Sequence, residues 1–159
     1  MSATSHPMQK YRDDPKTYYV KENVSTKEYR LHNYVYKLGI VNMPAIVKYD
    51  EESQVMVLIR VGVSSVADWY GSESHSTPAP VFKQIHNIVA TLAENNIEYA
   101  DVTGFNFMIN PIAASAADDD QPVAKKDMWV IDFGDAQFKA NGVTDPYVID
   151  LLADPEMNE

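Results

Sequence analysis

The sequence predicts an α+β fold with a single core. Two segments, 25–38 and 78–94, have apolar residues at helical spacing, and short apolar stretches rich in β-branched or aromatic residues lie between and around them. The length of 159 residues is typical of one domain. A hydrophobic fraction of 45% is ordinary for a globular protein, so we expect a folded core.

The first third of the chain predicts one helix and a small set of strands. The helix covers 25–38, because Leu31, Tyr34, Val35 and Leu38 recur at i, i+3, i+4 and i+7 and Gly39 follows as a C-cap. Residues 1–16 show no apolar periodicity and are predicted to form a tail or arm. Strands are expected at 17–21, 45–49 and 54–59, the last two as a hairpin.

The sequence after residue 59 predicts further helices and two more strands. Ser64 or Ser65 is expected to cap a short helix that runs to Tyr70, and Pro78 or Pro80 to open a longer one. Apolar strands are predicted at 105–109 and 128–131, separated by a surface loop at 110–127, and a last short helix at 145–152.

The charge of the chain restricts its partners. A net charge of -10 and a pI near 4.7 repel nucleic acid and anionic membranes, so we expect a protein substrate or protein partner, with the oligomeric state open. A nucleotide site would need local cations or a divalent metal, for which Mg²⁺ is the natural candidate. The absence of cysteine fits an intracellular protein, and no apolar run has the length of a membrane span or a signal peptide.

Two motifs follow one another in an order that indicates phosphoryl transfer. Asp101 is followed five positions later by Asn106, and Asp132-Phe133-Gly134 comes next, each motif beside an apolar strand. Each is common by chance, but their coincidence is not. The chain therefore resembles the protein-kinase-like superfamily, in particular the miniature Ser/Thr kinase-like proteins of large DNA viruses, with RIO-like reduced kinases as the nearest cellular analogy.

The resemblance implies a reduced two-lobed fold, with 17–62 as the smaller lobe and 63–159 as the larger. It also implies ATP and Mg²⁺ as cofactors, and phosphoryl transfer to Ser/Thr hydroxyls. Asp101 would be catalytic, and Asn106 and Asp132 would hold the metal. The nucleotide-binding residues would be Lys21, Glu28, Ile59 and Val61. A viral origin would place the protein in the host cell or the virion.

Two of these assignments have rivals in the sequence. Lys48 follows Ile46-Val47 and also resembles a phosphate-binding lysine, but it comes after the helix, whereas Lys21 comes before it. Glu28 is on the apolar side of its helix and could pair with Lys21, but it could equally complete a capping box with Ser25.

Departures from the family pattern support a second interpretation. Tyr99 and Ala100 stand where His and Arg precede the catalytic Asp, and Thr103 stands where a phosphate-contacting Lys is usual. No glycine occurs before Gly39, so the Gly-rich loop is missing. The alternative is therefore a weak or inactive pseudokinase that acts as a binding or structural module, possibly of a virion.

Overall fold

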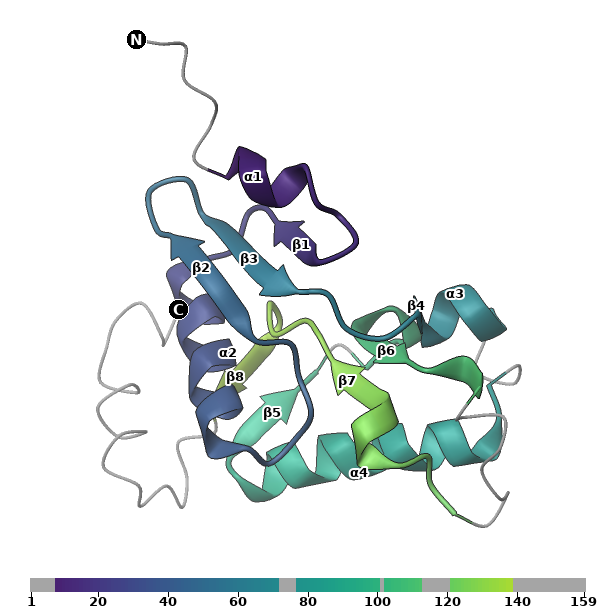
Figure 1. The fold of residues 1–159 in the computed structure, drawn as a ribbon. Coiled ribbons are helices and arrows are strands. Elements are labelled where there is room, and N and C mark those ends of the chain that lie inside the picture. Colours follow the sequence, from purple (N-terminus) through teal and green to yellow (C-terminus); the bar gives the residue numbers. More distant parts are fainter. Residues whose placement is uncertain (1–7, 72–76, 101, 113–120, 139–159) are drawn as a thin grey trace, which may run out of the picture.

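The computed structural model describes residues 8–71, 77–100, 102–112 and 121–138. Asp101 and the helix expected at 145–152 lie outside these ranges. Figure 1 shows the elements, which in chain order are α1 (Gln9–Arg12), β1 (Tyr18–Lys21), α2 (Thr26–Leu38), β2 (Ile46–Asp50), β3 (Val55–Ile59), β4 (Ser64–Ser65), α3 (Val66–Tyr70), α4 (Ala79–Glu94), β5 (Ile97–Tyr99), β6 (Phe107–Ile109), β7 (Met128–Val130) and β8 (Ala136–Phe138).

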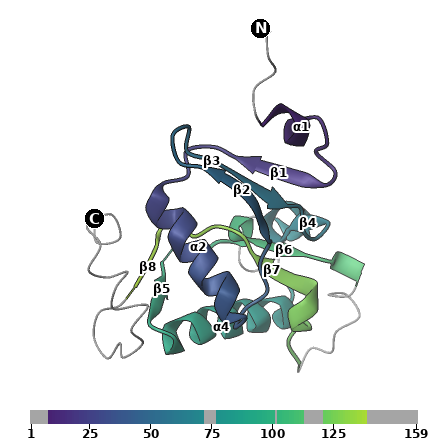
Figure 2. The same ribbon diagram turned by 60° about the vertical axis from the view of Figure 1, so that its left-hand side comes forward.

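The first sheet is antiparallel, in the order β1-β3-β2, and is covered on both faces. On its outer face Met8 packs on Val55 and Val57. On its inner face Met56 and Leu58 pack with Val24 and with Tyr29 of α2. Figure 2 shows α1 and α2 on opposite sides of this sheet. Double coverage explains the unbroken apolar run of β3, since each of its two faces needs buried side chains.

The described part of the predicted tail or arm, 1–16, contains helix α1, which packs on the sheet. Met8 is fully buried, and the ring of Tyr11 meets that of Tyr18 edge to face, with 5.0 Å between centroids. A four-residue helix is too short to show periodicity in sequence, and it is ordered because the outer face of β1 and β3 supplies its apolar partners.

Helix α2 confirms the prediction of a helix between a Ser25 cap and Gly39. The Ser25 hydroxyl oxygen accepts a hydrogen bond from the Glu28 N–H at 3.1 Å. Gly39 ends the helix with φ of 66°, a left-handed conformation that favours glycine. Leu31 and Val35 are fully buried, as their helical spacing predicts.

The rest of the described chain forms a second core over α4. Strands β4, β6 and β7 form one antiparallel sheet, and β5 pairs with β8 in another. Strands β6 and β7 and the capped helix α3 confirm the predicted elements, except that residues 105 and 106 belong to a short 3-10 helix, Gly104–Asn106. Strands β5 and β8 were not predicted, because a polar residue interrupts each of these three-residue segments, whereas β6 and β7 are apolar throughout. The main core cluster includes Leu31, Val35, Val81, Ile88, Leu92, Phe107, Ile109, Met128, Val130 and Phe133.

The connection from β3 to β4 joins the two parts. Gly62 has φ of +70°, and a Cβ atom there would lie 3.0 Å from Cβ of Met108 and 3.1 Å from the carbonyl oxygen of Ile109. The next residue, Val63, donates its N–H to that same carbonyl at 2.9 Å. Glycine is therefore needed where this connection crosses β6 closely. None of the helices in the described ranges is both long and apolar enough to cross a membrane.

Candidate functional site

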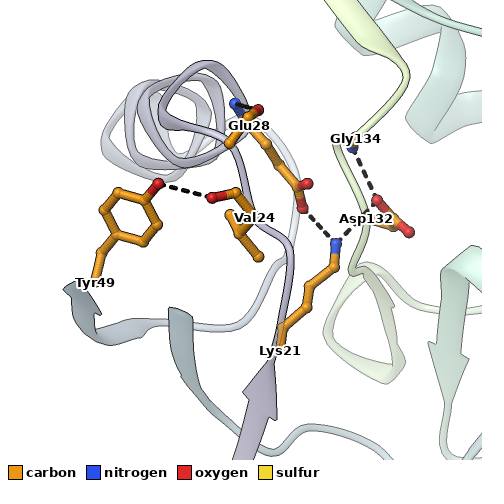
Figure 3. Close-up of polar contacts among 7 residues, drawn as sticks. Lys21, Val24, Glu28, Tyr49, Asp132 and Gly134 are labelled. Atoms are coloured by element: carbon orange, nitrogen blue, oxygen red, sulfur yellow. Dashed lines mark hydrogen bonds and ion pairs between the residues drawn. The ribbon is translucent and has the colours of Figure 1, made fainter. Parts of the chain in front are cut away.

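Lys21 lies at the centre of a three-residue charge cluster. Its ammonium donates hydrogen bonds to the Glu28 carboxylate and, at 3.0 Å, to Oδ1 of Asp132 (Figure 3). The side chains of Lys21 and Glu28 are 18% and 7% exposed, whereas that of Asp132 is 38% exposed. The cluster thus ties β1 and α2 to a loop more than a hundred residues later in the chain, and Asp132 is its solvent-facing member.

Local structure explains why these three groups meet. Strand β1 leads into α2 within a few residues, so a side chain at the end of the strand lies beside the first turn of the helix. Ser25 caps the amide of Glu28, while the Glu28 carboxylate bonds to Lys21. The Glu28 carboxylate therefore takes the ion-pair role, and not the bond to the Ser25 amide that the capping-box alternative gave it. Lys48 is exposed on β2 and makes no ion pair with a described residue.

Burial and the paired charges act together on the protonation of the cluster. Burial lowers the pKa of Lys21, but the hydrogen bond from its ammonium to Glu28 and the charges of Glu28 and Asp132 outweigh this, so the net pKa is raised. Burial raises the pKa of Glu28, and although Lys21 opposes the shift, Asp132 and Asp135 add to it. The ammonium is therefore fully charged at neutral pH and is held where it can meet an anion.

Gly134 allows the two carboxylates to approach closely. Its N–H donates to Oδ1 of Asp132 at 2.8 Å. A Cβ atom at this position would lie 3.1 Å from that oxygen and 3.3 Å from Oε1 of Glu28. Both bonds to Asp132 use Oδ1, so a cation would approach this carboxylate through Oδ2.

Three aromatic rings pack together beneath the loop that carries Asp132. Phe133 is buried, and its ring lies edge to face against His32 of α2 and against Tyr99 of β5, with 5.6 Å between centroids in each pair. His32 Nε2 is bonded to the Pro44 carbonyl oxygen at 2.9 Å. Burial lowers the pKa of His32 to about 4, so at neutral pH the ring is neutral. These edge-to-face contacts hold Phe133 in place. Because Asp132 is the preceding residue, they also restrict the direction of its side chain.

The backbone segments that carry two of the expected site residues, Asn106 and Asp132, are hydrogen-bonded to one another. The N–H of Ile131 donates to the carbonyl oxygen of Asn106 at 3.0 Å, which places Asn106 beside the strand end that carries Asp132. Asn106 is 7% exposed. No group of three or more His, Asp or Glu side chains among the described residues could hold a metal ion. One carboxylate with one amide still fits Mg²⁺, which commonly takes few protein ligands and completes its shell with phosphates and water.

An apolar pocket of about 350 Å³ opens beside this cluster. Ile59 and Val61 line it, as does Ile131, the residue before Asp132. Tyr19, Arg60 and Asp68 also line it and were not among the site residues assigned from the sequence. Tyr19 could have been found, because alternation along β1 puts it on the same face as Lys21. Asp68 lies in the first turn of α3, which Ser65 caps, and its place at the pocket follows from the position of that helix.

Comparisons with known proteins return structures alone. No protein-family model matches the sequence, and no curated protein matches it. Among solved structures, the chain is similar to the Cydia pomonella granulovirus kinase PK-1, with 19% identity over 76% of this chain and 43% of that one, at a TM-score of 0.48. It is also similar to WbdD in a co-crystal with the kinase inhibitor LY294002, with 19% identity over 77% of this chain and 26% of that one, at a TM-score of 0.46.

The geometry of the chain itself carries the fold assignment. A three-stranded antiparallel sheet presents a lysine to a glutamate on the next helix and to the aspartate of Asp-Phe-Gly, and a single connection beside the pocket leads into the second core. This arrangement fits the α+β, reduced protein-kinase-like fold that the sequence predicts. The chain spans less than half the length of either solved structure.

Proposed function

We propose that this chain binds ATP with Mg²⁺ in the pocket beside Lys21 and transfers the terminal phosphoryl group to a Ser or Thr hydroxyl of a protein. The observation that carries the proposal is the part-buried ammonium of Lys21, which is bonded to both Glu28 and Asp132. The residue before Asp132, Ile131, lines an apolar pocket. An ammonium held by two carboxylates is a fixed point charge, and phosphoryl transfer depends on positioning and charge stabilisation.

Each part of the site has a role in binding. The base would enter the pocket between Ile59 and Val61, and the phosphates would extend toward Lys21. Asp132 and Asn106 would hold Mg²⁺, which supplies neutralisation of phosphate charge when bound. In this proposal residues 17–62 belong to a smaller lobe and 63–159 to a larger one, with 8–16 added to the smaller lobe by the docking of α1.

Asp101 is proposed as the residue that orients the acceptor. The hydroxyl oxygen of the acceptor would attack the γ-phosphorus, the bond from phosphorus to the bridging oxygen would break, and ADP would leave. The hydroxyl proton would pass to the Asp101 carboxylate. This role comes from the motif that Asp101 forms with Asn106 in the sequence.

The proposal has a rival in a binding module without turnover. No glycine precedes Gly39, and Met8 and Tyr11, at the helix before β1, pack on the outer face of the sheet. Phosphates would then be held by fewer groups than in a kinase with a Gly-rich loop, which favours weak binding. The two functions differ in whether the chain turns over ATP and in whether substitution of Asp101 changes that turnover.

The test is nucleotide binding and turnover with matched variants. Thermal shift with ATP should show a rise in Tm that requires Mg²⁺, and turnover should be measured as ³²P transfer to acidic and basic protein acceptors. Asp132→Asn should abolish both the Mg²⁺ dependence and turnover, because the amide keeps the size of the carboxylate but loses its charge. Asp101→Asn should leave the Tm shift nearly unchanged and reduce turnover about 100-fold or more.

Three outcomes decide between the functions. A Mg²⁺-dependent shift with turnover supports the kinase. A shift without turnover in the wild type, and with no effect of Asp101→Asn, supports the inactive module. If neither ATP nor Mg²⁺ changes Tm, nucleotide binding is wrong.

A further inference from the structure

Tyr19 is an aromatic side chain exposed at the wall of the pocket. It is 44% exposed although it lies in the middle of a strand, and it lines the pocket. Its cross-strand partner is Leu58, an inner-face residue that also lines the pocket. Tyr18 and Val20, on either side of Tyr19, pack instead on the outer face. The ring of Tyr19 is therefore directed to the same face as Lys21, with no core to cover it.

Arg60 holds the ring of Tyr19 in place. The guanidinium carbon of Arg60 lies 5.4 Å from the centre of the Tyr19 ring, within the range of a cation–π contact. Arg60 is itself fixed at two points, since its Nε donates to the Pro15 carbonyl at 2.6 Å and its backbone N–H to the Thr17 carbonyl at 2.9 Å. An exposed tyrosine held by an anchored arginine is less free to rotate and so loses less entropy on binding.

The pocket has the volume and the lining residues for a largely apolar ring. Its volume of about 350 Å³ lies within the range of small-molecule sites. Its apolar wall includes Leu58, Ile59 and Met108, and Asp68 and Ser65 add hydrogen-bonding groups. Tyr18, the other tyrosine of β1, packs on the outer face of the sheet, so Tyr19 is the aromatic residue of this strand that faces the pocket.

We propose that Tyr19 is a stacking platform for the nucleobase, held by Arg60, which takes over the part of base binding that a covering loop would otherwise provide. This inference rests on the proposed function and deepens it, because it assigns base affinity to a residue outside the charge cluster. Base–aromatic stacking is sequence-tolerant, so the site should accept purine nucleotides with little preference for the exocyclic groups.

The experiment measures binding of the base and binding of the phosphates separately. Dissociation constants of adenosine, MgATP and base-free magnesium tripolyphosphate are measured by calorimetry for the wild type, Tyr19→Ala and Tyr19→Phe. Tyr19→Ala should weaken adenosine and MgATP about tenfold or more and leave tripolyphosphate within about twofold, since stacking acts on the base. Tyr19→Phe should bind like the wild type, and Arg60→Gln should give an intermediate loss.

Tyr36→Ala is the matched control. Tyr36 is a tyrosine of α2 with 45% exposure, close to the 44% of Tyr19, and it does not line this pocket. It should change neither adenosine nor MgATP binding, and Tm values of all variants report whether they fold.

The outcomes distinguish this inference from the function beneath it. If folded Tyr19→Ala binds adenosine and MgATP like the wild type, or if it loses tripolyphosphate to the same extent, the stacking role is wrong while the proposed function stands. If the wild type binds none of the three probes, both fail. A selective loss of adenosine and MgATP in Tyr19→Ala supports the inference.

Discussion

Two lysines on the same sheet, Lys21 on β1 and Lys48 on β2, have opposite environments. Lys21 is opposite Met56, an inner-face residue, whereas Lys48 is opposite Val57, an outer-face residue. Directly opposed residues in an antiparallel pair point to the same face, so Lys21 faces α2 and Lys48 faces away from it. The first is paired with two carboxylates and the second is exposed.

An irregularity in β2 decides the direction of Lys48. Ile46 is opposite Leu58 and Lys48 is opposite Val57, so two steps along β2 match one step along β3. Without this bulge, residues 46 and 48 would share a face and Lys48 would point inward with Ile46. The comparison teaches that similar sequence around a lysine does not fix its role, because one extra residue in the pairing moves a charge to the other side of the sheet.

The largest expected effect comes from exchanging each lysine for methionine. Lys21→Met leaves the buried Glu28 carboxylate without its partner, so we expect about 3 kcal/mol loss in the free energy of unfolding. MgATP turnover should fall about 100-fold or more. Lys48→Met should change stability by less than about 0.5 kcal/mol and leave turnover unchanged. Urea unfolding and the ³²P assay measure both.

The double variant Lys21→Met/Glu28→Gln sharpens this result. Removing both charges should restore part of the stability lost in Lys21→Met while turnover stays low. Equal losses for Lys21→Met and Lys48→Met would contradict the contrast between the two faces.

Helix α2 also carries His32, which is fully buried. Protonation of this ring would place a charge without a partner in the core, and the effect of pH on stability tests whether the fold excludes it. The folded pKa of His32, about 4, is below the usual 6.5, so the unfolded chain gains a proton that the folded chain does not as pH falls. Stability should therefore be intact above pH 6.5, decrease between pH 6.5 and 4 by up to about 3 kcal/mol, and level off below. Urea unfolding against pH measures this slope.

His32→Leu is the variant that isolates the effect. It should remove the histidine part of the slope, although it also removes the bond to the Pro44 carbonyl and so lowers stability at all pH values. A slope between pH 6.5 and 4 that is unchanged in His32→Leu would assign it to other groups.

The smallest expected effect is at Gly134, where the crowding of the Lys21 cluster can be tested without changing a charge. A methyl group would press on Asp132 Oδ1 and Glu28 Oε1, so Gly134→Ala should cost about 1 kcal/mol and weaken MgATP binding severalfold. Gly39→Ala is the control, since its Cβ would meet nothing within 4 Å but its positive φ costs about 1 kcal/mol. It should lower Tm and leave nucleotide affinity unchanged.

The sequence by itself determined the elements whose pattern is long or capped. Helix α2 follows from the spacing of Leu31 and Val35 between Ser25 and Gly39, and α4 from the same periodicity. It also placed Lys21, Glu28 and Asp132 as candidates through motif order, because a motif keeps residue types in sequence whatever the intervening loops do. Their predicted roles are the subject of the experiments above.

The tertiary structure alone decided what depends on partners distant in the chain. Strands β5 and β8 exist because each pairs with the other, although neither has enough residues to show a period. Met8 is buried because the outer face of β3 is available to it, and Tyr19 lines a pocket whose other walls come from β3, the connection after it and β6. The register that turns Lys48 outward is set by hydrogen bonds between strands. A local pattern cannot encode such contacts, because each one requires two segments to be brought together by the folded core.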